Sequence, residues 1–342
     1  MEITYKTIMN KIPFLLVLLC LFVGCSKDSE GAEPTTYNYF YPTDEASITA
    51  AQIGNGTGTL DPKGIAIANE KLYVANGDVL EVFNAVTLAH IKTITEYKKG
   101  TTTIPMAAIT SVAVDKGRIY IGSRESRLFV IDETTNAGIS VLGNGQWWQT
   151  FVHVFGVVVR DGLVFVKEKE TSIKVFETTQ ITESSEWNLK PIAKLNTLNG
   201  FDQIYSMDVD AGNLVVAGRD AKSYLYYNID AIKANAAQSL TEPIKPVTVP
   251  FDAKPIAVSF TKDWAITSEN VGSNNYLRLY TKPDFMNRIF TASVNASDIL
   301  GQNPFGSIVG VAQLNDRLFL SDNTNKKIRV LKLNKSVIAE QR

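Results

Sequence analysis

Apolar and polar residues follow the same plan six times along the chain. In each repeat, a short apolar run is followed by a polar pair, by a second run that is apolar at nearly every position, and by a third run in which apolar and polar residues alternate. Successive repeats begin 45 to 53 residues apart, at Gly64, Ser111, Gly156, Ser206, Ala257 and Gly310. A period near 50 residues is typical of a four-stranded propeller blade.

The runs within a repeat predict strands that differ in exposure. Polar pairs such as Lys116-Gly117 and Asp161-Gly162 accept the positive backbone angles of tight hairpin turns. The second run, for example "LVFVK" at 163–167, predicts a strand that neighbouring blades cover on both faces. A more variable fourth run follows, such as "PIAKLN" at 191–196. We therefore expect an all-β protein, a six-bladed β-propeller of four-stranded antiparallel blades.

The last repeat lacks a fourth strand, and the other end of the chain can supply it. Only three strands fit between Gly310 and Arg342, whereas the segment Ser47–Gly56 predicts a strand with no blade of its own. We expect this N-terminal strand, at Ser47–Ile53, to pair beside Lys327–Leu333 and close the last blade, because closure removes open sheet edges. The propeller domain is then predicted to span residues 46–342.

The first residues predict an export signal. Lys6 and Lys11 precede the apolar run Ile12–Val23, whose 12 residues are too few to cross a bilayer as a helix but suit the core of a signal peptide. The run ends in Gly24 and Cys25, a junction that resembles the bacterial lipobox, in which the cysteine thiol receives the lipid. We expect residues 1–24 to be a cleaved lipoprotein signal peptide and Cys25 to be lipidated.

The residues after the cysteine predict where the protein goes. The segment "SKDSE" lacks the aspartate directly after the cysteine that favours inner-membrane retention, and it resembles the export tag of surface lipoproteins in glycan-degrading Gram-negative bacteria of the Bacteroides type. We expect a protein anchored to the outer membrane by its N-terminal lipid and exposed on the cell surface. Residues 25–45 are polar and contain Pro34 and Pro42, which predicts a lipidated tether.

The repeats resemble the NHL family of six-bladed propellers. The clearest match is "GVAQLNDRLFLSDNTNKKIRVLKL" at 310–333, with its Gly-Val-Ala strand, second apolar strand, Asp-x-x-Asn turn and Ile-x-Val strand. The resemblance covers about residues 47–334 and implies the fold, whereas proteins of this fold serve as enzymes, binding modules and scaffolds. In that turn, Asp322 and Asn325 are expected to bond to the backbone rather than to bind calcium.

Charge and cysteine content exclude several kinds of function. The 34 Lys and Arg nearly balance the 35 Asp and Glu, and no long basic run occurs, so no nucleic-acid partner is expected. Cys20 leaves with the signal peptide and Cys25 carries lipid, so the folded part has no thiol chemistry. The two histidines, His90 and His153, are too few for a zinc site built from several histidines.

Loops that lead into the first strand of each repeat should converge on the central channel, and we expect the functional residues there. The ligand-binding candidates are Lys63, Trp147, Trp148, His153, Gln203, Tyr205, Phe251 and Lys254. Ser307 lies on the corresponding loop of the last repeat. Aromatic rings at this end suit the faces of sugar rings or a protein contact, or they plug the channel and seal adjacent blades.

A second group of loop residues could bind a metal. Propellers similar to gluconolactonase and paraoxonase bind calcium through carboxylates in this region, and Asp61, Asp202 and Asp252 could imitate them. The alternative is that these aspartates cap turns.

Three classes of function stay open. The favoured one is a monomeric, non-catalytic module that binds a glycan or a protein partner in an outer-membrane uptake complex, with no cofactor. The alternative is a metal-dependent, lactonase-like hydrolase, which requires the aspartates to meet at one calcium ion. The third is a structural scaffold, for which a plugged channel and a large apolar surface patch are expected.

Overall fold

The computed structural model describes residues 36–56, 58–146, 150–168, 172–185, 187–196, 204–218, 222–234, 239–240, 245–248, 253–261, 264–272, 274–282, 285, 292–295 and 306–339. The chain forms two compact units: Phe40–Lys335 is the larger, and Met1–Tyr39 with Ser336–Arg342 the smaller. Of the smaller unit, the structure describes only the ends of strands β1 and β27. In the described part of the chain, no helix is long and apolar enough to span a membrane.

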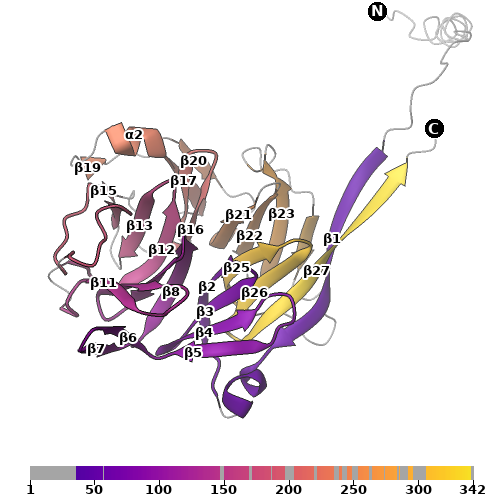
Figure 1. Ribbon diagram of the computed structural model, residues 1–342. Coiled ribbons are helices and arrows are strands. Elements are labelled where there is room, and N and C mark those ends of the chain that lie inside the picture. The colour runs from indigo at the N-terminus through magenta and orange to yellow at the C-terminus, as the bar shows by residue number, and fades with distance from the viewer. Residues whose placement is uncertain are drawn as a thin grey trace, which may run out of the picture. The chain divides into compact units, whose positions relative to one another are not determined.

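The larger unit is a six-bladed β-propeller (Figure 1). From the innermost strand outward, the first blade consists of β2 (Pro62–Ala68), β3 (Lys71–Asn76), β4 (Val79–Asn84) and β5 (His90–Ile94). The second consists of β8 (Ile109–Asp115), β9 (Arg118–Ser123), β10 (Arg127–Asp132) and β11 (Gly138–Leu142). The third consists of β12 (Val154–Arg160), β13 (Leu163–Glu168), β14 (Ser172–Glu177) and β15 (Ala193–Asn196). A short strand, β19 (Ser239–Leu240), pairs parallel to β15 at the edge of the third blade.

The other three blades follow the same order. The fourth consists of β16 (Ile204–Asp210), β17 (Asn213–Gly218), β18 (Ser223–Asn228) and β20 (Lys245–Thr248). The fifth consists of β21 (Lys254–Phe260), β22 (Trp264–Val271), β23 (Asn274–Thr281) and β24 (Ala292–Asn295). The sixth consists of β25 (Ile308–Leu314), β26 (Arg317–Asp322), β27 (Lys327–Ala339) and β1 (Thr36–Ile48). Outside the blades lie the hairpin β6 (Glu96–Lys99) to β7 (Thr102–Pro105), helix α2 (Ile229–Ala234) and two 3-10 turns, η1 (Ala50–Gln52) and η2 (Gly54–Gly56). The predicted fold, blade number and strand order are confirmed.

The turns between the first two strands have the backbone angles that the sequence predicts. Lys116 and Gly117 have φ angles of 47° and 75°, and Asp161 and Gly162 have φ angles of 53° and 79°. Two consecutive positive φ angles are typical of the tight turn that matches the twist of a hairpin.

The core lies between the blades. In β3, β9, β17 and β26 every residue after the first is buried, as expected for strands covered on both faces. One cluster, for example, joins Tyr73 and Val82 of the first blade to Ile109, Ile121 and Phe129 of the second. Each blade therefore depends on its neighbours for burial of its apolar residues.

The N-terminal strand closes the last blade, but it is not the predicted segment. The strand that pairs with β27 is β1, Thr36–Ile48, whereas Ala50–Gln52 and Gly54–Gly56 form 3-10 turns, so the prediction of a closing strand at Ser47–Ile53 is wrong. Residues 36–45, which were assigned to the tether, lie in β1. Pro42 is compatible with this position, because an outermost strand has one edge without a partner strand and tolerates proline there.

Candidate channel mouth

Six inner strands surround a central channel in the larger unit. They are β2, β8, β12, β16, β21 and β25, and the cavity that they line has a volume of about 1150 Å³. A cavity of this size is comparable with the larger clefts that hold small ligands. The channel is thus a candidate binding site in the part of the chain that the structure describes.

Every inner strand carries a β-bulge close to its first residues. Its pairing with the second strand shifts between Pro62 and Ile65, Ile109 and Ser111, Val154 and Gly156, Ile204 and Ser206, Pro255 and Ala257, and Ile308 and Gly310. The residues within these shifts include Lys63, Thr110, Phe155 and Val309, all of which line the channel. Bulges re-aim side chains and are frequent beside functional sites, so this ring of bulges determines which side chains face the channel.

A small residue lies at each bulge, and at two of the bulges the backbone of the adjacent inner strand comes close to it. A Cβ atom on Gly64 would lie 2.8 Å from the Cα of Ser111, and one on Gly310 would lie 3.0 Å from the carbonyl oxygen of Lys63. Gly64 and Gly310, which begin the first and last sequence repeats, therefore occupy close contacts between inner strands.

Buried polar residues at the end of the second strand hold the loops that lead into the inner strands. The hydrogen bonds are Asp61 N–H to Asn76 Oδ1 at 2.6 Å, Ser123 Oγ–H to the Ala107 carbonyl at 2.5 Å, Val152 N–H to Glu168 Oε1 at 2.9 Å and Gly306 N–H to Asp322 Oδ1 at 3.1 Å. Asp322 also accepts hydrogen bonds from the Asn325 N–H at 3.1 Å and from Arg329 Nε at 2.8 Å. The prediction that Asp322 has a structural role in its turn is confirmed.

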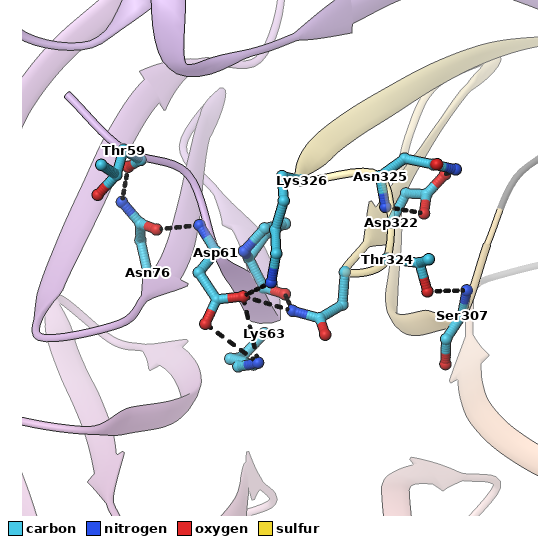
Figure 2. A network of polar contacts seen from close by, with 11 residues as sticks. Thr59, Asp61, Lys63, Asn76, Ser307, Asp322, Thr324, Asn325 and Lys326 are labelled. Atoms are coloured by element: carbon cyan, nitrogen blue, oxygen red, sulfur yellow. Dashed lines mark hydrogen bonds and ion pairs between the residues drawn. The ribbon is translucent and has the colours of Figure 1, made fainter. Parts of the chain in front are cut away.

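Asp61 accepts hydrogen bonds from three side chains. Lys63 Nζ lies 3.2 Å from Oδ2, Asn323 Nδ2 lies 2.9 Å from Oδ1, and Lys326 Nζ also contacts Oδ1. Figure 2 shows both lysines reaching the carboxylate, while Asn76 accepts from the backbone N–H. Burial raises the pKa of Asp61, but the hydrogen bonds from Lys326 and Lys63 outweigh it and leave the pKa below its ordinary value.

These contacts argue against a metal ligand role for Asp61. Two ammonium groups beside one carboxylate repel a metal cation. Within the described residues, no three His, Cys, Asp or Glu side chains gather as a metal site would require. Asp202 and Asp252, the other two candidates, lie outside the described residues.

Arg124 and Phe155 form the other side of the same end of the channel. The exposed Arg124 follows strand β9, and its guanidinium carbon lies 5.6 Å from the ring centroid of Phe155. Both residues line the channel, together with Lys63, Ser307 and Asn323. We call these five residues the channel mouth. They come from four consecutive blades, the sixth, first, second and third.

The structure brings together some of the residues predicted from sequence. Lys63 lies at the channel mouth, and Lys254 begins β21, half-buried. His153 lies behind Arg124, because its Nδ1 contacts the Arg124 carbonyl and its backbone N–H donates to Ser126 Oγ at 3.2 Å. Its position therefore supports the Arg124 turn. Tyr205 belongs to β16, and its side chain is outside the description. Trp147, Trp148, Gln203, Phe251 and the lipidation candidate Cys25 lie outside the described residues.

Sequence reasoning missed Arg124 and Phe155. Both positions follow from the repeat itself, since Arg124 comes directly after the second strand and Phe155 occupies the bulge position equivalent to Lys63. An alignment of the six repeats on their first small residue places Phe155, before Gly156, at the position that Lys63 occupies before Gly64.

A carboxylate lies deeper in the channel. Asp208 is three residues beyond Tyr205, or about 10 Å along β16 at the usual rise of a strand. Burial raises the pKa of Asp208 to about 6, although its oxygens accept the N–H groups of Phe260 at 2.7 Å and Val209 at 2.8 Å. The two bonds pair one N–H of β21 and one of β16, and they hold the carboxylate in place.

Comparisons with known proteins add the following. No protein-family model matches the chain, and no curated protein matches it. Among solved structures, it is similar to the crystal structure of the computationally designed protein Ika8, with a TM-score of 0.46 and 10% sequence identity, covering 80% of this chain and 96% of that chain. The function therefore has to be inferred from the residues of the channel mouth.

Proposed function

We propose that the protein is a cell-surface lipoprotein whose propeller binds a glycan at the channel mouth without catalysing a reaction. The observation that carries the proposal is the cavity of about 1150 Å³, whose mouth combines the ring of Phe155 with the polar side chains of Lys63, Arg124, Ser307 and Asn323. Sugars bind through such combinations, because their hydroxyl groups need hydrogen bonds and their C–H faces pack on apolar rings.

The surface location rests on the sequence. The Gly24-Cys25 junction and the "SKDSE" segment after it support attachment to the outer membrane by lipid. A glycan bound at the propeller would then be held at the cell surface, where a neighbouring uptake complex could receive it.

The hydrolase alternative has less support than the binding module. It requires Asp61 to bind calcium, whereas the Asp61 carboxylate contacts Lys63, Lys326 and Asn323. Without Asp61 as a calcium ligand, the hydrolase hypothesis depends on Asp202 and Asp252 alone.

The test is calorimetric titration of the purified protein with a panel of neutral and acidic oligosaccharides, with and without calcium, alongside a lactone hydrolysis assay. The proposal predicts saturable binding of at least one oligosaccharide, equal in calcium and in a chelator, and no turnover. Calcium-dependent hydrolysis of a lactone would overturn it in favour of the alternative.

A further inference from the structure

Among the residues that the structure describes, Arg124 differs from its basic neighbours at the channel mouth in having no acidic partner. Lys63 and Lys326 share the carboxylate of Asp61. Within the described part of the chain, the guanidinium of Arg124 contacts the ring of Phe155, and no carboxylate or carbonyl accepts a hydrogen bond from it. A contact with an aromatic ring uses the face of the guanidinium and none of its N–H groups. These donors, which lie in the plane of the guanidinium, are then available to a ligand.

Glu168, a carboxylate that also lines the channel, is already occupied. Glu168 accepts hydrogen bonds from Lys174 Nζ at 2.9 Å, Ser172 Oγ at 2.6 Å and the Val152 N–H at 2.9 Å. Its charge is thus directed into the third blade, where Lys174 balances it. No carboxylate of the described residues balances Arg124, and a ligand in the channel could do so.

We propose that the channel mouth recognises the carboxylate of an acidic sugar, with Arg124 as the direct donor and Lys63 as a second positive group. This inference rests on the proposed function and names the class of glycan. A planar guanidinium matches the two oxygens of a carboxylate and can form two parallel hydrogen bonds with it. One unpartnered guanidinium beside a lysine that Asp61 partly neutralises suits a group of charge −1, as in a uronic acid, better than a phosphate.

The remaining residues of the channel mouth suit the rest of such a sugar. Asn323 donates through Nδ2 to Asp61 and to the Pro62 carbonyl at 3.0 Å, which fixes its side chain and leaves Oδ1 to accept from a hydroxyl group. The Ser307 N–H donates to Thr324 Oγ1 at 3.0 Å, and no described residue bonds to the Ser307 hydroxyl. Hydroxyl groups of a sugar ring are therefore matched by both an acceptor and a donor.

The test is a pair of probes that differ only in charge. Tri-galacturonic acid and its fully methyl-esterified form are titrated into the full protein and into the variants Arg124→Gln and Arg160→Gln. Arg160→Gln is the matched control, because Arg160 also lines the channel but lies at the opposite end of β12 from Phe155.

The acid is expected to bind the unaltered protein more tightly than its ester, and Arg124→Gln should weaken binding of the acid by about tenfold to a hundredfold, the usual effect of losing hydrogen bonds between charged groups. Binding of the ester should change little, and Arg160→Gln should leave both affinities unchanged. Equal binding of acid and ester, or an effect of Arg160→Gln as large as that of Arg124→Gln, would overturn the inference. Binding of only neutral oligosaccharides would overturn it while the proposed function stands, whereas binding of no oligosaccharide at all would overturn both.

Discussion

Gly64 lies at a close contact between the inner strands of the first two blades. A Cβ atom there would meet the Ser111 Cα at 2.8 Å and the Thr110 carbonyl oxygen at 3.0 Å, and both are backbone atoms. At the equivalent Gly156, the nearest atoms are side-chain carbons of Lys167 at 3.4 Å and Met207 at 3.5 Å, which is ordinary contact. The same substitution should therefore have different effects at the two positions.

We predict that Gly64→Ala lowers the free energy of unfolding by about 1 to 3 kcal/mol, the usual cost of inserting an atom into a closely packed region. Gly156→Ala serves as the control and should change it by less. Urea denaturation of both variants measures the difference. Equal stability of the two would show that the first and second blades can move apart without cost.

Glu133 joins the first two blades at the end of the propeller opposite the channel mouth. Its carboxylate accepts from Tyr73 Oη at 2.8 Å, Lys71 Nζ at 3.1 Å and Asn69 Nδ2 at 3.0 Å. Burial raises the pKa of Glu133, but the hydrogen bonds from Tyr73, Asn69 and Lys71 outweigh it and hold the pKa below its ordinary value. The charged form is thus favoured by the folded state.

We predict that Glu133→Gln lowers the free energy of unfolding by about 1 to 3 kcal/mol at neutral pH, since the buried hydroxyl of Tyr73 loses a charged acceptor. Because the folded pKa of Glu133 is depressed, its stabilisation is present above the ordinary value of 4.5 and is lost as pH falls below it. The stability difference between the variant and the unaltered protein should shrink over that range. Glu96→Gln, at an exposed position, is the control, and a difference that persists in acid would contradict the account.

At the scale of the element, β1 holds the last blade closed. Besides its pairing with β27, Asn334 Nδ2 donates to Thr43 Oγ1 at 2.8 Å and Arg317 Nε donates to Glu45 Oε2 at 3.1 Å. Without β1, strand β27 would become an open edge with unpaired N–H and C=O groups, which favours association between molecules.

We predict that a variant beginning at Thr36 keeps a single cooperative thermal transition, whereas one beginning at Ser47 loses it and associates. Thermal unfolding with light scattering compares the two variants. If both unfold alike and stay monomeric, β1 is dispensable and the ring closes by other contacts.

The same strand shows how far the sequence predicts the fold. Six repeats with buried second strands were sufficient for the blade number and for the need of an N-terminal strand to complete the last blade. The strand Thr36–Ile48 does contain an alternating run, with Tyr37, Tyr39 and Tyr41 at every second position, but Pro42 interrupts it. The position of the strand was missed because proline and the polar residues after it are also typical of a tether. The site was predicted only in part: Lys63 was found from its loop position, while Arg124 and Phe155 depend on bulges and contacts between blades that a single repeat does not reveal.

At the scale of the whole molecule, we predict that the protein is anchored by lipid at Cys25. Mass spectrometry of the protein from membranes should find Cys25 as the first residue, carrying acyl chains, and Cys25→Ser should release the protein from the membrane fraction. An unmodified N-terminus at another residue would rule out lipid attachment there.

The central claim is that ligand binds at the channel mouth, and a blocking substitution tests it most directly. Ser307→Trp should fill this space while it keeps the local backbone bonds, because Ser307 uses its N–H and its carbonyl, which accepts from the Asn323 N–H at 3.1 Å. Thr101→Trp, in the exposed β6–β7 turn, is the control. Calorimetric titration with the oligosaccharide that binds the unaltered protein best is the measurement. We predict that Ser307→Trp abolishes binding, that Thr101→Trp binds as the unaltered protein does, and that both variants keep its thermal unfolding. Full binding by a folded Ser307→Trp variant would contradict the account.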